Sequence, residues 1–567
     1  MEPCDYLIVG AGPAGCVLAN RLSEDPATRV TLIEAGPDRN ARRAIIRIPL
    51  AMVTFMAPAL AFLGGPRFMA WFQTEPEPGL QGRAIPLPRG RGTGGCSNVN
   101  GQIFIRGQRE DFDHWRDLGN PGWGHDDLLP YFRKLERLEA LADPASTQSL
   151  TLDGQSLTDG IDTALHGTTG PLNVAAPRGL NPMTKVFLRA AQMAGLPLTP
   201  DFNGAQQAGV GLYSFTQAKG QRVTAEGAYL DPIRHRPNLT ILPDRLVTRI
   251  LMDGRRATGV AWTGKAGAGT TLAKEVILSA GSFVSPHLLM LSGIGDARDL
   301  ARQGIPVIHD LPGVGRNLQD HLDVTLQYRA RTTAPYGLSS RALPRNVLHV
   351  LDWLFRRRGL FASTTAEAGG FVSVRNPTRP DAQLFFCAGV ANTQDAKGFT
   401  GHGFLVHVCD LRPGSIGQLR LKTANSLDQP EILYNFLRDA STTEVLREGI
   451  RLARRIVAQP PFAPHLGAEL APGPEAVSDG ALDAFIRTTV GTLFHPVGTC
   501  AMGTGPEAVV DPATLRVYGI SGLRVVDASV MPTLVSGNTV AATYCLAEKA
   551  ADLVKADRLS AQVLHTG

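Results

Sequence analysis

The first thirty-four residues follow the order of hydrophobic and polar positions that is typical of a βαβ unit. Residues 6–9 (YLIV) form a short apolar run that predicts a strand buried on both faces, and residues 29–34 (RVTLIE) predict a second strand. Between them, after a glycine-rich turn at 10–15, apolar residues recur at helical spacing up to Leu22. Two strands joined by a helix in this way predict a parallel sheet.

The two ends of the chain resemble each other in pattern, and the middle differs from both. Residues 275–281 (EVILSAG) and 523–529 (LRVVDAS) predict further buried strands, and a helix is expected over 538–556. Short strands and helices with long connections are mixed between about 316 and 489. We therefore predict an α/β protein with a discontinuous Rossmann-like domain and an inserted α+β domain. The first covers 1–158, 212–315 and 490–567, and the second covers 159–211 and 316–489.

Length and composition agree with a globular protein of more than one domain. A chain of 567 residues exceeds what one hydrophobic core normally organises. The net charge of +5 comes without a basic run interleaved with aromatic residues, so no nucleic-acid partner is predicted. The seven cysteines are scattered without metal-ligand spacing, which predicts free thiols and no metal site. The N-terminus lacks a signal-peptide pattern, so a cytoplasmic location is expected.

Two apolar stretches raise the question of whether the protein associates with a membrane. Residues 45–63 are nearly all apolar, but Arg47, Pro49 and Pro58 interrupt them, so a spanning helix is not expected. They could form a lid over a substrate entrance or a membrane-docking loop. Residues 343–361 combine an apolar face with three arginines, which fits a solvated helix end or docking to anionic lipid. If both stretches share one face, peripheral association with the inner face of the membrane follows.

The motif Gly10-x-Gly12-x-x-Gly15 predicts a dinucleotide site. Glycines let a pyrophosphate approach backbone N–H groups at a helix N-terminus, where a Cβ would obstruct it. Glu34, at the end of the second strand, offers acceptor oxygens to ribose hydroxyls. The motif does not separate FAD from NAD.

Two further patterns are ambiguous when the residues are taken alone. The glycine-rich segment 88–101 could lie flat against a second phosphate or a ring, or could equally be a surface loop. His495 and Asn538 could form a catalytic pair, but a lone histidine is more often structural, and Asn before Thr is often a helix cap. The residues alone favour the structural interpretation of this pair.

Several spaced motifs together resemble the glucose–methanol–choline (GMC) oxidoreductase family. Residues 281–295 (GSFVSPHLLMLSGIG) match the second family signature, and residues 90–113 match the first except at Thr93 and Cys96. The segments 312–321 (PGVGRNLQDH) and 494–500 (FHPVGTC) extend the resemblance over essentially the whole chain.

The resemblance implies that FAD occupies the N-terminal site and that residues 90–101 wrap the flavin. Val99 stands where some members carry a histidine bonded to the flavin, so FAD is expected to be noncovalent. Val247 matches a position whose backbone contacts adenine, and Asp527, Ala528 and Thr539 match a segment that closes over the cofactor. The predicted cofactor-binding residues are Gly10, Gly12, Pro13, Ala14, Gly15, Glu34, Ala35, Arg91, Gly92, Thr93, Gly94, Gly95, Ser97, Asn98, Val99, Asn100, Gly101, Val247, Ala280, Gly281, Asp527, Ala528, Asn538 and Thr539.

The resemblance favours the catalytic interpretation of His495 and Asn538 over the structural one, because it places both side chains at the reactive edge of the flavin. It implies oxidation of an alcohol to an aldehyde, with His495 as the base, Asn538 as a donor to the alcohol oxygen, and hydride transfer to flavin N5. A primary aliphatic alcohol and a quinone acceptor are favoured. Three alternatives remain: a choline dehydrogenase, an oxidase that uses oxygen, and a cyanohydrin lyase without redox chemistry. In a choline dehydrogenase, Trp71, Phe72 and Glu367 could bind the quaternary ammonium of the substrate.

Overall fold

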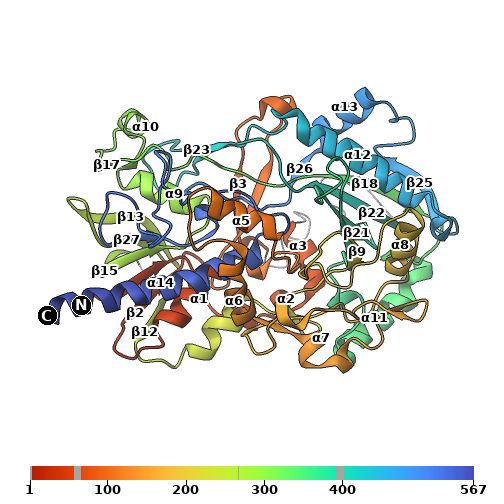
Figure 1. The fold of residues 1–567 in the computed structure, drawn as a ribbon, viewed down its shortest axis with the longest axis horizontal. Coiled ribbons are helices and arrows are strands. Elements are labelled where there is room, and N and C mark those ends of the chain that lie inside the picture. Colours follow the sequence, from red (N-terminus) through yellow and green to blue (C-terminus); the bar gives the residue numbers. More distant parts are fainter. Residues whose placement is uncertain (1–2, 57–64, 266, 391–400, 567) are drawn as a thin grey trace.

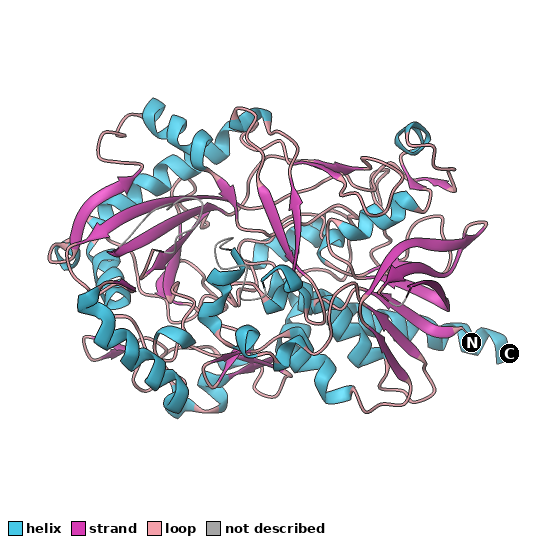
Figure 2. Ribbon diagram, turned by 180° about the vertical axis from the view of Figure 1, so that it is seen from behind, coloured by secondary structure: helices cyan, strands magenta, loops and turns pink. Residues whose placement is uncertain are grey.

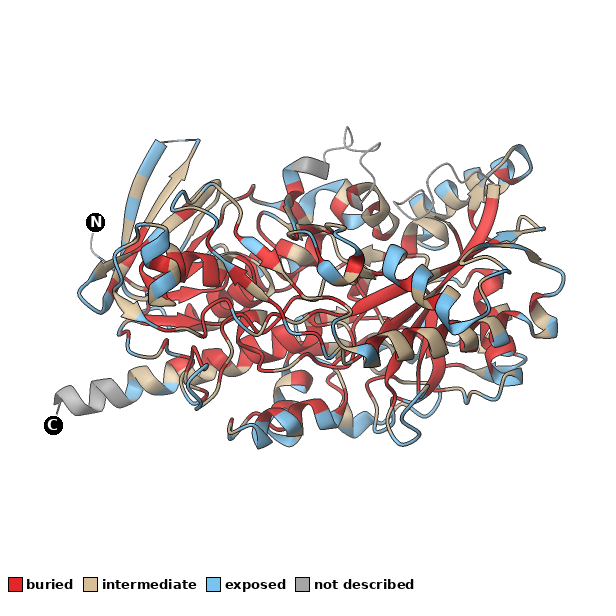
Figure 3. Cartoon of the chain, turned by 90° about the horizontal axis from the view of Figure 1, so that it is seen from above, coloured by how far each residue is buried: buried red, intermediate tan, exposed pale blue. Residues whose placement is uncertain are grey.

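Two large sheets lie at opposite ends of the molecule's long axis (Figures 1 and 2). The computed structural model describes residues 3–56, 65–265, 267–390 and 401–566. Buried residues concentrate in the central strands of both sheets and in the helices beside them, and strands at the sheet edges carry exposed residues (Figure 3). Most of the buried hydrophobic residues of both sheets belong to a single cluster. The predicted mixed α/β class is confirmed.

The first sheet contains the predicted βαβ unit. Strand β1 (Cys4–Val9) pairs in parallel with β2 (Val30–Ile33) and β15 (Gly267–Leu278). The parallel part is completed by β12 (Leu239–Leu242) beside β2 and by β27 (Leu523–Val525) beside β15. An antiparallel extension of β15 is formed by β14 (Arg256–Gly264) and β13 (Arg245–Asp253). Strands are therefore confirmed at all four predicted places, although β15 ends at Leu278 and β27 ends at Val525, before the predicted ends at 281 and 529.

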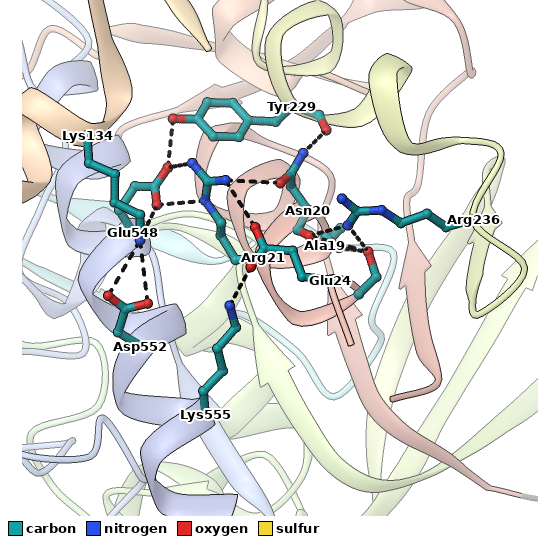
Figure 4. Close-up of polar contacts among 11 residues, drawn as sticks. Ala19, Asn20, Arg21, Glu24, Lys134, Tyr229, Arg236, Glu548, Asp552 and Lys555 are labelled. Carbon is teal, nitrogen blue, oxygen red and sulfur yellow. Dashed lines mark hydrogen bonds and ion pairs between the residues drawn. The ribbon is translucent and has the colours of Figure 1, made fainter. Parts of the chain in front are cut away.

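Helix α1 (Pro13–Leu22) crosses between β1 and β2, and α14 (Val540–Thr566) packs along it (Figure 1). Figure 4 shows the polar contacts that join them. Glu548 on α14 is fully buried and accepts hydrogen bonds from both Arg21 Nη2 and Arg21 Nε, at 2.7 and 2.8 Å. The same carboxylate accepts from the Tyr229 hydroxyl at 3.0 Å and lies 3.2 Å from Lys134 Nζ. This network fixes α14, which begins two residues after Asn538, relative to the glycine turn that precedes α1.

The second sheet is antiparallel, in the order β25 (Leu466–Ala471), β18 (Leu322–Ala330), β22 (Gly401–Asp410), β21 (Ala382–Cys387), β20 (Ala368–Val372), β9 (Gly209–Leu212). The helices α8 (Pro182–Met193) and α12 (Ala440–Val457) pack against each other and against this sheet, and α13 (Asp479–Thr489) packs on α12. Side chains alternate between the two faces of a strand. On β18, Val324 and Leu326 are therefore buried in the core, while Asp323, Thr325 and Gln327 face a cavity on the other side.

The strands of the two sheets fall largely within the two predicted groups of segments. The exceptions lie at the predicted boundaries. Strand β9 begins at Gly209 and ends at Leu212, and the short β26 (Gly491–Thr492) pairs with β18 of the second sheet. The domain boundaries themselves stay a prediction.

Smaller elements connect the sheets. The hairpin β3 (Met69–Gln73) and β4 (Pro86–Gly90) leads into the second glycine-rich loop. The remaining α-helices of the described residues are α2 (Ala44–Arg47), α3 (Met52–Met56), α4 (Gly65–Phe68), α5 (Arg109–Asp117), α6 (His125–Leu135), α7 (Glu139–Ala142), α9 (Val284–Leu291), α10 (Ala297–Arg302) and α11 (Leu343–Arg356). The remaining strands are β5 (Glu136–Leu138), β6 (Thr151–Leu152), β7 (Gln155–Ser156), β8 (Leu172–Val174), β10 (Gln217–Ala218), β11 (Gln221–Arg222), β16 (Ile294–Gly295), β17 (His309–Asp310), β19 (Gly337–Leu338), β23 (Gln418–Arg420) and β24 (Glu431–Leu433).

The two apolar stretches take different forms. Residues 45–56 form short helical pieces, and Leu50, Met52 and Val53 line the cavity, as a segment over a substrate entrance would. The rest of that stretch, 57–63, lies outside the described residues. The second stretch forms α11. Among the helices that the structure describes, none combines the length and apolarity needed to cross a membrane.

Candidate active site

One cavity of about 1180 Å³ lies between the two sheets and is lined by residues of both. The carboxyl ends of β1, β2 and β15 open into it, because Gly10, Glu34 and Ser279 directly follow these strands. Sites for one drug-sized ligand measure roughly 300–1,000 Å³. The cavity therefore has room for a dinucleotide and a small substrate together.

The glycine turn is shaped for a phosphate at the N-terminus of α1. Gly12, Pro13 and Ala14 line the cavity, and the N-cap residue of α1 is Gly12, which has no side chain to occupy the N–H groups of the first turn. A Cβ on Gly12 would meet none of the described protein atoms within 4 Å, so the space in front of it is open to a ligand. A Cβ on Gly15 would instead lie 1.9 Å from the Gly10 carbonyl oxygen. Gly12 therefore leaves room for the ligand, and Gly15 lets the helix pack against the turn.

Glu34 connects the first glycine turn to the second glycine-rich loop. Its Oε2 accepts the Ala11 N–H at 2.9 Å, and its Oε1 accepts the N–H groups of Gly36 and Gly92 at 2.8 and 2.9 Å. A carboxylate offers about four acceptor positions. Three are used by the backbone, which leaves capacity for the predicted ribose hydroxyl.

The 90–101 loop divides into residues that face the cavity and residues that hold the loop in place. Gly95, Val99, Asn100 and Gly101 line the cavity. The side chains of Ser97 and Asn98 are instead buried within the loop. The hydroxyl of Ser97 donates to the Gly94 carbonyl at 2.6 Å, and Asn98 Nδ2 donates to the Thr93 carbonyl at 2.8 Å.

Most of the predicted site residues meet at the cavity. Those that line it are Gly10, Gly12, Pro13, Ala14, Glu34, Ala35, Arg91, Gly95, Val99, Asn100, Gly101, Val247, Ala280, Gly281, His495, Asp527, Ala528, Asn538 and Thr539. The remaining predicted residues, Gly15, Gly92, Thr93, Gly94, Ser97 and Asn98, are not among its lining residues, and their contact with the cofactor stays a prediction.

Asp527 ties the C-terminal segment to the end of β15. Its Oδ2 accepts the Gly281 N–H at 2.8 Å and the Ser285 hydroxyl at 2.6 Å. A helix N-terminus, flat glycine backbone and an acidic strand end meet in one cavity large enough for a dinucleotide. The residues present therefore fit FAD.

His495 and Asn538, 43 residues apart, lie side by side in the cavity. Their Nε2 and Nδ2 atoms are 3.2 Å apart. The preceding residue, Phe494, has a φ of 64°, a left-handed conformation that non-glycine residues seldom adopt and that is often found at functional sites. The buried Asn538 Oδ1 has no hydrogen-bond partner among the described residues.

A second histidine, His321, lies behind His495. The two Nδ1 atoms are 2.9 Å apart, and His321 Nε2 lies 3.2 Å from the Leu411 carbonyl oxygen. A carbonyl only accepts, so His321 Nε2 carries the proton and its Nδ1 is an acceptor. His495 Nδ1 must then be the donor of the shared hydrogen bond, which leaves a lone pair on His495 Nε2. The histidine pair thus fixes the tautomer in which the nitrogen beside Asn538 can take a proton.

Burial keeps both rings neutral. Burial lowers the pKa of His495 well below its usual range, and the nearby His321 and Arg89 lower it further. Burial likewise lowers the pKa of His321 to about 3. An imidazole with a free lone pair is the form that can act as a base.

The backbone of His495 is held by a buried carboxyl group. Asp320 Oδ1 accepts the His495 N–H at 2.8 Å, and Oδ2 accepts the hydroxyls of Thr492 and Tyr434 at 2.5 and 3.1 Å. Burial raises the pKa of Asp320 to about 6.

The sequence reasoning missed Asp320, His321 and Arg89 as parts of this site. Residues 320 and 321 end the segment 312–321, which carried the family resemblance but received no role. His321 is 174 residues from His495, and no local periodicity brings them together. The available signal was the polar sequence Gln-Asp-His at 319–321, to which no role had been assigned.

Comparison with known proteins gives the same family that the sequence motifs resemble, over almost the whole chain. The N- and C-terminal sequence profiles of GMC oxidoreductases match residues 4–323 and 413–547. The chain is 41% identical to the alcohol dehydrogenase [acceptor] of Pseudomonas putida, over 97% of this chain and 95% of that protein. It is 42% identical to the mitochondrial choline dehydrogenase of Homo sapiens, over 97% and 89%.

A solved structure agrees with the fold. The crystal structure of pyridoxine 4-oxidase from Mesorbium loti superimposes with a TM-score of 0.81 at 32% identity, covering 97% of this chain and 98% of that one. Sequence, fold and cavity lead to one assignment: the chain belongs to the GMC oxidoreductases, FAD-dependent flavoproteins that here act on CH–OH groups.

Proposed function

We propose that the protein oxidises a neutral primary aliphatic alcohol to the aldehyde, with His495 as the base. The observation that carries the proposal is the lone pair on His495 Nε2, held beside Asn538 Nδ2 at 3.2 Å in a cavity shared with the cofactor residues. An alcohol oxygen within hydrogen-bond distance of both atoms can replace their mutual contact, donating its proton to Nε2 and accepting a hydrogen bond from the carboxamide.

The roles of the two residues differ because only one of them titrates. His495 removes the hydroxyl proton as the C–H bond breaks. Asn538 stays neutral and donates to the oxygen while negative charge develops there. FAD supplies the hydride acceptor when it is bound. We further propose that FAD is held noncovalently, because Val99, which lines the cavity at the expected attachment position, has no nucleophilic atom.

The charges in the cavity favour a neutral substrate over a quaternary ammonium. The carboxylates lining it are Glu34, Asp323 and Asp527, and each has protein partners; Asp323 lies 2.8 Å from His407 Nδ1. Burial opposes the charge on His407, but the facing Asp323 carboxylate outweighs it and raises the pKa of His407. The pair is thus an ion pair that a cationic substrate would have to break.

Only two of the three residues that could bind choline lie at the cavity. Trp71 and Phe72 line the cavity. Glu367 is fully buried among the Asn181 N–H and the hydroxyls of Thr184 and Ser363, at 2.7 to 2.8 Å. It is therefore committed to the second sheet's core and is not available to a cation.

For the electron acceptor we propose a quinone. Two observations support it: the relative from Pseudomonas putida is named for a separate acceptor, and the apolar residues Leu50, Met52 and Val53 line the cavity. Reoxidation by oxygen is the competing outcome.

Anaerobic stopped-flow mixing of the holoenzyme tests the proposal. Straight-chain primary alcohols should bleach the flavin absorbance, and choline should do so more slowly. Faster bleaching by choline would overturn the substrate class. Absence of bleaching by any alcohol would overturn the proposed alcohol oxidation and would favour the cyanohydrin lyase alternative. A soluble quinone should then restore the absorbance faster than oxygen does.

A further inference from the structure

Helix α11 (Leu343–Arg356) presents its polar side to the protein and its apolar side outward, the reverse of an ordinary surface helix. On the inner side, Arg345 donates to the carbonyls of Thr333 and, at 3.2 Å, of Pro335. Asn346 Nδ2 donates to the Gly337 carbonyl at 3.1 Å, and the rings of His349 and Tyr336 pack in a T-shaped arrangement with their centroids 5.7 Å apart. The helix is thus held to the second sheet's connections by hydrogen bonds.

The outward side is a continuous apolar ridge. Leu343, Val347, Val350, Leu351 and Leu354 recur at spacings of three, four and seven residues, which places them on one face. Leu348 and Phe355 extend this face on one side. The exposed fractions reach 62% for Leu343 and Leu348 and 82% for Phe355. Contiguous exposed apolar surface of this kind is uncommon unless it binds something.

Exposed cations lie at both ends of this ridge. The segment 340–358 contains five arginines and a single acid, Asp352, which lies 3.6 Å from Arg356. Arg341, Arg356 and Arg358 are exposed at the ends of the ridge. An apolar face bordered by exposed arginines complements a bilayer whose headgroups are anionic.

The ridge lies beside the cavity. Asn346 on the inner side of α11 and Leu360 just after it line the cavity, as do Leu50, Met52 and Val53. Figure 1 shows α11 on the outside of the second sheet's end of the molecule. A surface that α11 rested on would therefore be close to the cavity wall.

We infer that α11 docks the protein peripherally on an anionic lipid surface, with Leu343, Val347, Leu351, Leu354 and Phe355 inserted among the lipids and the arginines at the headgroups. The docking does not depend on the proposed reaction, so it can be tested without activity.

Flotation of the holoenzyme with vesicles tests the docking, with flavin absorbance as the measure of intact protein. Vesicles that contain phosphatidylglycerol should carry the protein at low salt, and vesicles of phosphatidylcholine alone should carry much less. Binding should weaken at high salt, where headgroup and arginine charges are screened. Arg356→Gln and Arg358→Gln should each weaken it about fivefold.

The paired change Leu354→Asp with Phe355→Asp should abolish at least about nine-tenths of the binding, since two inserted side chains become charges. Leu427→Asp is the matched control, because Leu427 is 67% exposed elsewhere on the surface and its change should leave binding intact. Three results would overturn the inference: no flotation with anionic vesicles, equal flotation with both vesicle types, or self-association in sedimentation that the Leu354/Phe355 change removes. Reduction of the flavin by a soluble alcohol should be the same in all these variants.

Discussion

The Nδ1 atom of His321 accepts the Nδ1 proton of His495 across 2.9 Å, with the two rings nearly perpendicular at 89°. This hydrogen bond determines which nitrogen of His495 faces the cavity as a free base. His321 itself is fully buried and does not line the cavity, so it acts through His495 as a positioning residue.

Replacing His321 by Leu should slow flavin reduction by about 10- to 100-fold, because His495 loses the acceptor that selects its tautomer. His321→Gln, whose side-chain oxygen can still accept a hydrogen bond, should recover part of the rate. Stopped-flow reduction rates and their pH profile measure both variants. A purely structural role would lower FAD content and stability without this difference between Leu and Gln.

Replacing Asn538 by Ala should slow flavin reduction by about 10²–10³-fold, the effect of removing one donor to a developing oxyanion. His495→Ala should cost about 10²–10⁴-fold, the usual contribution of a general base. In both variants the flavin spectrum should show that FAD remains bound. A change in alcohol affinity alone, with an unaltered limiting rate, would contradict these roles.

Arg89 is one of the neighbours that lower the pKa of His495, so Arg89→Gln should raise it. The neutral imidazole is the active form, and reduction fails when His495 is protonated at low pH. The acid limb of the wild-type rate profile should therefore lie below about pH 6.5, the ordinary histidine value, and should move to higher pH in the variant. Arg316→Gln, a change at an exposed ion pair, should leave the limb in place.

Gly12→Ala should impair FAD binding, whereas Gly15→Ala should also impair folding. The added methyl group on Gly12 points into open space, so the protein should fold but lose FAD during gel filtration. The methyl group on Gly15 would lie 1.9 Å from the Gly10 carbonyl oxygen, so that variant should lose folded yield as well. Circular dichroism and the ratio of flavin to protein absorbance distinguish the two. Full FAD retention in Gly12→Ala would show that the space serves another purpose.

Arg21→Met should destabilise the protein by about 3–5 kcal/mol, because it leaves the fully buried Glu548 carboxylate without its main partner. Lys555→Met is the control, since it removes an exposed pair with Glu24 and should cost about 0–1 kcal/mol. Thermal unfolding of the two FAD-loaded variants gives the comparison. Equal melting temperatures would mean that the network in Figure 4 does not hold α14 to α1.

Local signals in the sequence determined the parts of the fold that depend on neighbours along the chain. Alternation of apolar runs and turns identified β1, α1 and β2, and the Gly10–Gly15 turn with Glu34 identified the dinucleotide site, because strand, turn and helix have short-range physical requirements. The apolar face of 343–361 was also visible in the sequence.

Tertiary structure alone decided the relations between distant residues. Glu34 was expected to serve the ribose, and the fold shows that it also holds Gly92 of the second loop. Only packing brings His321 behind His495, and only packing turns the apolar side of α11 outward, since helical spacing defines a face but not its direction. The neutral state of His495 follows from its burial between two sheets, and its tautomer follows from the hydrogen bond with His321. No segment of the chain possesses either property by itself.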